Sequence, residues 1–141
     1  MNIVIVGTGY VGLVTGVGFS EQGHKISFID LDSTKIGKLA NKELPFFEPG
    51  LDEYFSNEEN FIRMSFHDNY AGINWDETDI VFICVQTPNN IETNSVDTKF
   101  LESAISEISK LNKLLMKFFS ELSSKRLIIF IELFSSSSKF N

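Results

Sequence analysis

The feature that most constrains this chain is a glycine pattern directly after its first apolar run. Residues 2–6 read NIVIV, and residues 7–12 read GTGYVG, which matches G-x-G-x-x-G. A short β-branched run that ends at glycine predicts a buried strand, and the spacing of apolar residues after Tyr10 predicts a helix. Six-residue glycine patterns recur by chance, but a glycine turn between a strand and a helix is typical of dinucleotide-binding domains.

Each glycine of the turn has an expected task. Gly7 permits the tight turn, Gly9 lets a pyrophosphate approach the backbone, and Gly12 lets the helix pack closely on the strand. The start of the helix then presents unpaired N–H groups and a partial positive charge to the anion. We expect Gly16 and Gly18 to continue a close-packed inner face of the same helix.

A carboxylate follows the turn at the required distance. Asp30 lies eighteen residues after Gly12 and ends the apolar segment KISFID. At the end of a second strand it can accept hydrogen bonds from the adenosine ribose hydroxyls, whereas a 2'-phosphate would meet a negative charge. The pattern therefore predicts NAD rather than NADP. The alternative is a glycine turn used only for packing, but strand, glycines, helix and acid all lie in register, which favours binding.

The rest of the chain alternates strand and helix patterns, which predicts an α/β fold. Such alternation places helices on both faces of a parallel sheet. We expect a Rossmann-type, doubly wound sheet of five strands in the order 3-2-1-4-5 that lacks its far edge. The domain would span residues 1–131, followed by an irregular tail at 132–141. The expected strands are 2–6, 25–30, 61–66, 79–85 and 127–131; the expected helices are 10–23, 32–39, 51–55 and 101–115, with a polar loop at 87–96.

Composition excludes several classes of function. A net charge of −7 argues against a nucleic-acid partner, and no apolar stretch reaches the roughly 20 residues that span a bilayer. The single cysteine, Cys84, rules out an internal disulfide and fits a reducing cytoplasm. Cys84 lies within an apolar strand pattern, which favours a core thiol over a nucleophile. His24 and His67 have no clustered partners, so we expect no metal site.

Three segments together resemble the N-terminal domain of the UDP-glucose/GDP-mannose dehydrogenase family. They read MNIVIVGTGYVGLVTG at the start, LPFFEPGLDEYF at 44–55 and DIVFICVQTPN at 79–89. The resemblance is nearer to the UDP-glucose members than to the GDP-mannose members. It implies oxidation of a sugar C6 alcohol to a carboxylate with two NAD molecules, through a thioester on a cysteine.

The resemblance also implies roles for particular residues. Gly7, Gly9 and Gly12 would hold the pyrophosphate, with backbone N–H groups offered by Tyr10 and Val11. Asp30 would bind the ribose, Lys35 would contact the cofactor beside it, and Thr87 would lie at the cofactor's edge. No role follows for Glu48.

One departure concerns the end of the chain. In the family, the fifth strand runs into a Ser-Thr-Val-Pro-type motif, whereas this sequence continues Glu132-Leu133-Phe134-Ser135. We therefore expect no catalytic residue and no substrate domain in this chain, as in a truncated, frameshifted or deliberately shortened product. A nucleotide sugar would be a partner only if a catalytic half is supplied, and a homo-oligomer stays open.

Three classes of function remain at this point. The chain could supply NAD to a catalytic half, it could be a bare NAD-binding module without chemistry, or it could be a decayed product without a role. The glycine turn and Asp30 favour the first two. The missing motif counts against autonomous catalysis.

Overall fold

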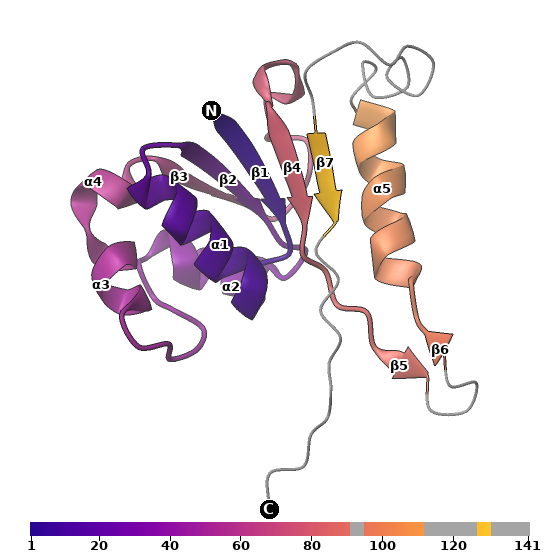
Figure 1. The fold of residues 1–141 in the computed structure, drawn as a ribbon, viewed down its shortest axis with the longest axis horizontal. Helices are drawn as coiled ribbons and strands as arrows, with labels where there is room; N and C mark the ends of the chain where they lie inside the picture. The colour runs from indigo at the N-terminus through magenta and orange to yellow at the C-terminus, as the bar shows by residue number, and fades with distance from the viewer. Residues whose placement is uncertain (91–94, 112–126, 131–141) are drawn as a thin grey trace, which may run out of the picture.

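A computed structural model describes residues 1–90, 95–111 and 127–130. Its main feature is a five-stranded parallel sheet in the order β3-β2-β1-β4-β7 (Figure 1). The strands are β1 (Asn2–Val6), β2 (Lys25–Ile29), β3 (Met64–His67), β4 (Ile80–Ile83) and β7 (Leu127–Phe130). In chain order this is 3-2-1-4-5, so the predicted doubly wound topology is confirmed.

The helices also follow the sequence pattern closely. They are α1 (Tyr10–Glu21), α2 (Ser33–Ala40), α3 (Leu51–Ser56), α4 (Glu58–Phe61) and α5 (Lys99–Leu111), with a 3-10 turn η1 (Trp75–Glu77). Asp32 caps α2 as expected, because its carboxylate accepts from the Lys35 N–H at 3.0 Å. Gly23 ends the α1 turn with a φ of +84°, a conformation that favours glycine.

The start of the third strand and the content of one loop differ from the prediction. The third strand was expected from residue 61, but Phe61 ends α4 and the strand begins at Met64. The Asn57 side chain accepts from two N–H groups of α4, and this cap starts a helix where β-prone residues suggested a strand. The loop expected at 87–96 contains a short antiparallel pair, β5 (Asn89–Asn90) and β6 (Ser95–Val96). The expected continuation of the last helix to residue 115 and the tail at 132–141 lie outside the described residues.

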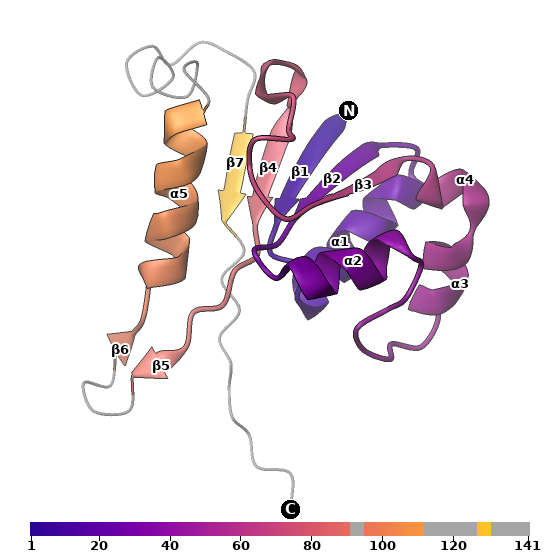
Figure 2. The same cartoon turned by 180° about the vertical axis from the view of Figure 1, so that it is seen from behind.

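The sheet is covered on both faces, which explains the nearly continuous apolar runs in its central strands. Ile3 and Ile5 of β1 face a core completed by α1, α2 and α3. Val4 and Val6 face a second core completed by α5 and the segment around Trp75. Figure 1 shows α1 in front of the sheet, and Figure 2 shows the segment between β3 and β4 crossing the opposite face.

The close packing of α1 rests on one of its two interior glycines. A Cβ added to Gly16 would lie 2.3 Å from the Phe28 ring on β2, so any larger residue there would have to displace this buried ring. Gly18 was expected on the same inner face, and this is wrong. Gly18 is exposed, and a Cβ there would meet nothing within 4 Å.

The strand order defines where a ligand can bind. β1 lies between β2 and β4, so the chain leaves β1 toward one side of the sheet and leaves β4 toward the other. Open α/β sheets bind ligands at this switch point, beyond the carboxyl ends of the strands. Among the helices of the described residues, none combines the length and hydrophobicity needed to cross a bilayer.

Candidate functional site

The turn after β1 can be built only from glycine at two positions. Gly7 has a φ of +97°, its N–H donates to the Ile29 carbonyl at 2.7 Å, and an added Cβ would lie 2.6 Å from the Cys84 carbonyl oxygen. A Cβ on Gly12 would lie 1.9 Å from the Gly7 carbonyl oxygen. Gly7 therefore permits the tight turn, and Gly12 permits the close approach of α1 to that turn, as the sequence predicts.

Gly9 differs from both, because nothing in the fold requires it. Its backbone is extended, with φ −70° and ψ −175°, and an added Cβ would meet no atom within 4 Å. Gly9 is the N-cap of α1 and, being glycine, supplies no capping side chain. The first-turn N–H groups, including those of Tyr10 and Val11, have no partner within the helix. An open approach to uncapped N–H groups fits an anion such as a pyrophosphate.

Asp30 follows β2 and is held by four hydrogen bonds. Its Oδ2 accepts from the Thr8 N–H at 2.9 Å, the Thr8 hydroxyl at 2.8 Å and the Lys35 ammonium at 2.8 Å. Its Oδ1 accepts from the Asp32 N–H at 3.1 Å. Burial opposes ionisation, but the bonds from Lys35, Thr8 and Asp32 outweigh it and lower the pKa of Asp30. The side chain is therefore a carboxylate at neutral pH.

Lys35 reaches Asp30 from the first turns of α2. The two side chains form an ion pair, with exposed fractions of 29% for Lys35 and 15% for Asp30. The Asp32 cap fixes the start of α2, and so places Lys35 above the end of β2. The positive charge of Lys35 is thus directed at Asp30.

A cleft of about 290 Å³ brings four of the predicted residues together. This volume lies near the lower end of the range for small-molecule pockets, roughly 300–1,000 Å³, and suits part of a dinucleotide. The four predicted residues on its wall are Gly7, Gly9, Asp30 and Lys35. The other side of the cleft comes from Tyr70 and from Phe100 and Ala104 of α5. Sequence reasoning missed these three, because no local motif marks a residue that reaches the cleft from a distant element.

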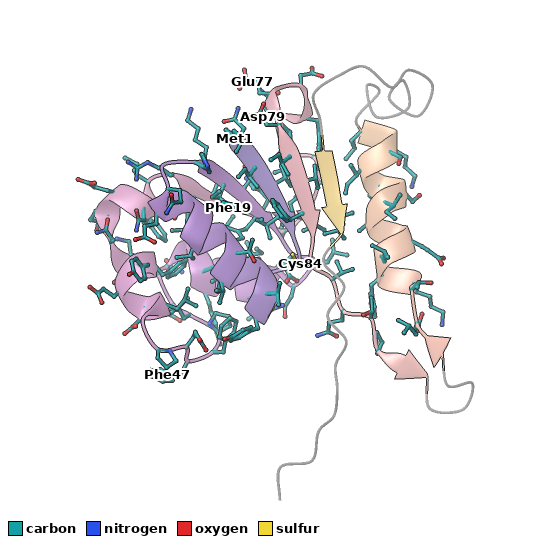
Figure 3. All side chains as sticks on the ribbon, in the orientation of Figure 1. Met1, Phe19, Phe47, Glu77, Asp79 and Cys84 are labelled. Carbon is teal, nitrogen blue, oxygen red and sulfur yellow. The ribbon has the colours of Figure 1, made fainter. Side chains whose placement is uncertain are left out.

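Cys84 also lines the cleft, and this corrects one expectation. It was expected inside the fourth strand, but β4 ends at Ile83 and Cys84 is only partly buried. Figure 3 shows it where the carboxyl ends of the strands converge. Burial raises the pKa of the Cys84 thiol to about 11. The thiol is therefore protonated at neutral pH.

Four predicted residues do not line the cleft: Tyr10, Val11, Gly12 and Thr87. Thr87 follows β4 by four positions and is partly exposed, and the lining from this segment is Cys84, Val85 and Gln86. Tyr10 is 53% exposed, and its ring lies 5.5 Å from the Phe46 ring. Its hydroxyl bonds to Glu48, which raises the pKa of Tyr10. Glu48 thus ties the loop before α3 to the first turn of α1, a role that the sequence did not reveal.

The remaining candidate groups lie away from the cleft. Asp79 accepts from the Asn2 N–H at 2.8 Å and joins the turn before β4 to the start of β1. Figure 3 shows Glu77 and Asp79 at the end of the sheet opposite Cys84. His67 lies 3.0 Å from the Ser65 hydroxyl, and His24 lies 3.4 Å from the amino terminus. In the described part of the chain, no three His, Cys, Asp or Glu side chains form a group able to bind a metal.

Comparison with known proteins decides the family. Residues 1–115 match the UDP-glucose/GDP-mannose dehydrogenase family, NAD binding domain. The chain belongs to this family. It comprises the family's NAD-binding domain, and NAD is the cofactor of that domain.

The chain is similar to several members of known name. It is 40% identical over 110 residues to UDP-glucose 6-dehydrogenase of Rickettsia typhi, covering 78% of this chain and 25% of that protein. It is 46% identical over 89 residues to UDP-glucose 6-dehydrogenase of Bacillus subtilis, covering 62% of this chain and 20% of that protein. The crystal structure of GDP-mannose dehydrogenase from Pseudomonas aeruginosa superposes with a TM-score of 0.70 at 33% identity, over 77% of this chain and 24% of that one. The chain thus spans about a quarter of the length of these relatives.

The residues present fit the cofactor of the family. The open approach at Gly9 leaves room for a pyrophosphate beside uncapped N–H groups. The ionised Asp30 carboxylate lies on the same cleft and can accept hydrogen bonds from ribose hydroxyls. The cleft therefore offers an anion site and a hydroxyl site side by side.

Proposed function

We propose that this chain is the NAD-binding part of a nucleotide-sugar 6-dehydrogenase, with UDP-glucose as the substrate of the complete enzyme. The observation that carries this proposal is the meeting of Gly7, Gly9, Asp30 and Lys35 on one cleft at the switch point of the sheet. The relatives named UDP-glucose 6-dehydrogenase support the choice of sugar nucleotide. GDP-mannose is the alternative, supported by the structural likeness to GDP-mannose dehydrogenase.

Within this function, the residues of the cleft and of the glycine turn beside it have distinct tasks. The N–H groups of Gly9, Tyr10 and Val11 bind the pyrophosphate, assisted by the positive end of α1. Asp30 accepts from the adenosine ribose, and Lys35 holds its carboxylate in place. A bound NAD would supply the hydride acceptor for oxidation of the sugar. The groups that orient the sugar and take its proton would come from a catalytic half, and the cytoplasm would be the site of action.

Selection of NAD over NADP follows from the charge at Asp30. A 2'-phosphate at the ribose would place an anion against an ionised carboxylate. Lys35 is the cation that the structure places beside Asp30, and its ammonium already lies 2.8 Å from Asp30 Oδ2. The ion pair therefore offers no free positive charge to a 2'-phosphate.

The glycine turn provides a direct test of the site. Gly9→Val should abolish NAD binding in isothermal titration calorimetry, because the new side chain would occupy the approach of the pyrophosphate. The fold should survive, since the Gly9 backbone is extended and its Cβ position is open. Gly18→Val, another exposed position without neighbours, serves as the control and should bind as the wild type does. Unchanged NAD affinity in folded Gly9→Val would show that the turn is purely structural.

A further inference from the structure

Thr8 is the one residue of the glycine turn whose side chain is fully buried beside the cleft. Its exposed fraction is 0%, although it carries a polar hydroxyl. Both of its donors are directed at a single atom: the N–H lies 2.9 Å and the hydroxyl oxygen 2.8 Å from Asp30 Oδ2. A buried hydroxyl needs a partner, and this one has a carboxylate.

The two oxygens of Asp30 are used unequally. Oδ2 accepts three hydrogen bonds, two from Thr8 and one from Lys35. Oδ1 accepts only the Asp32 N–H, at 3.1 Å, among the bonds of the described residues. A carboxylate offers about four acceptor positions over its two oxygens. The capacity left for an incoming hydroxyl therefore lies on Oδ1.

Thr8 and Lys35 differ in how firmly they hold Oδ2. Lys35 reaches it through a long, flexible side chain that is 29% exposed to solvent. Thr8 lies in the turn that Gly7 fixes, with a stiff β-branched side chain and no exposure. Thr8 is thus the fixed anchor of the carboxylate.

We propose that Thr8 is a positioning residue that fixes the Asp30 carboxylate through Oδ2 and leaves Oδ1 to accept a ribose hydroxyl of NAD. The inference rests on the proposed function for its ligand. It assigns a task to the residue between Gly7 and Gly9, which the glycine pattern leaves undefined. Thr8 would also link the two ends of the site, because a residue of the pyrophosphate-binding turn holds the ribose-binding Asp30.

The test compares Thr8→Val, Thr8→Ser and a matched control. Valine keeps the shape and the N–H but removes the hydroxyl, whereas serine keeps the hydroxyl. Thr78→Val removes a similar buried hydroxyl, one that donates to the Asn74 carbonyl at 3.0 Å, far from the cleft. The first readout is the pKa of Asp30, followed by carboxyl carbon chemical shifts in NMR and assigned with Asp30→Asn. The second is the dissociation constant for NAD.

We expect the pKa of Asp30 to rise toward its ordinary value of 3.8 in Thr8→Val and to stay low in Thr8→Ser and Thr78→Val. NAD affinity should fall by about tenfold or more in Thr8→Val, as for loss of a hydrogen bond to a charged group, and should change little in the other two. If Thr8→Val does not fold, Thr8→Ala removes the same hydroxyl without overpacking. Loss of stability with an unchanged Asp30 pKa would reduce Thr8 to a core residue and overturn the proposal. Failure of the wild-type chain to bind NAD would instead contradict the proposed function. The pKa of Asp30 in the variants would still decide whether Thr8 positions its carboxylate.

Discussion

A Cβ atom on Gly12 would lie 1.9 Å from the carbonyl oxygen of Gly7. The neighbour is backbone, which a side-chain rearrangement cannot relieve. Gly12→Ala should therefore push α1 off the sheet and lower the free energy of unfolding by about 3 kcal/mol or more, at the upper end of overpacking effects. Urea unfolding followed by the fluorescence of buried Trp75, the single tryptophan, measures this.

Gly18→Ala is the matched control for this effect. It lies in the same helix, but its Cβ position is open. Replacing glycine by alanine within a helix should raise the free energy of unfolding by about 0.5–1 kcal/mol. Equal effects at the two positions would contradict the close approach of α1 to the turn.

The acid sensitivity of the fold should depend on Asp30. Its pKa is lowered in the folded chain, so it adds stability above its unfolded pKa, and this stability is lost as the pH falls through the folded pKa. Asp30→Asn should therefore show a shallower loss of the free energy of unfolding than the wild type as the pH drops below about 4. Denaturant titrations at a series of pH values provide the comparison, with the exposed Asp52→Asn as control for the loss of one charge. Parallel curves for wild type and Asp30→Asn would show that the Thr8 and Lys35 bonds do not form in solution.

The thiol of Cys84 should react slowly although it lines the cleft. A pKa of about 11 in place of 9.0 lowers the thiolate fraction near pH 8 by about a hundredfold. The more basic thiolate is intrinsically faster by up to about tenfold, so about a tenfold slowing remains. Iodoacetamide labelling of folded and urea-unfolded chain, quantified by mass spectrometry, tests this. Labelling of the folded chain at the unfolded rate would contradict the burial of Cys84.

The isolated chain should reduce no NAD in the presence of UDP-glucose or GDP-mannose. Hydride transfer needs the alcohol held against the nicotinamide and a base for its proton, and positioning supplies much of the rate. The thioester route that the family resemblance implies for the step from aldehyde to acid would also need a covalent nucleophile, and the only cysteine is the protonated Cys84. Formation of NADH is followed by absorbance on highly purified chain. Turnover that disappears in Asp30→Ala would place the catalytic groups within these 141 residues.

Much of this architecture follows from local patterns in the sequence. The strand runs, the Gly7–Gly12 turn and the Asp32 cap each depend on neighbouring residues, and the parallel order follows from the helices between the strands. The start of β3 at Met64 could not be predicted, because the Asn57 cap competes with the β-propensity of Phe61 and Ile62. The periodicity of the sequence predicts which face of a helix a residue occupies, but not how deeply that residue is buried. It could not show that Gly16 packs on Phe28 whereas Gly18 does not.

The site was predictable to a lesser extent. Asp30 and the glycines of the turn can be recognised by their spacing in the sequence. The hydrogen-bond partners of Asp30 depend on three-dimensional contacts. Thr8 lies 22 positions before Asp30, and its hydroxyl meets the carboxylate only because β1 and β2 are adjacent. Tyr70 and Phe100 reach the cleft from the other face of the sheet. The link from Glu48 to Tyr10 likewise joins two segments that no local pattern connects.

We expect this cleft to bind NAD, and Asp30 to select NAD over NADP. Isothermal titration calorimetry of the wild-type chain with each dinucleotide, at one fixed salt concentration, tests it most directly. NAD should bind more tightly than NADP. Asp30→Ala should weaken the binding of NAD by about 1–3 kcal/mol and reduce the difference in affinity between NAD and NADP. Equal affinities for the two dinucleotides, or tighter binding of NADP by the wild-type chain, would contradict the assignment of Asp30.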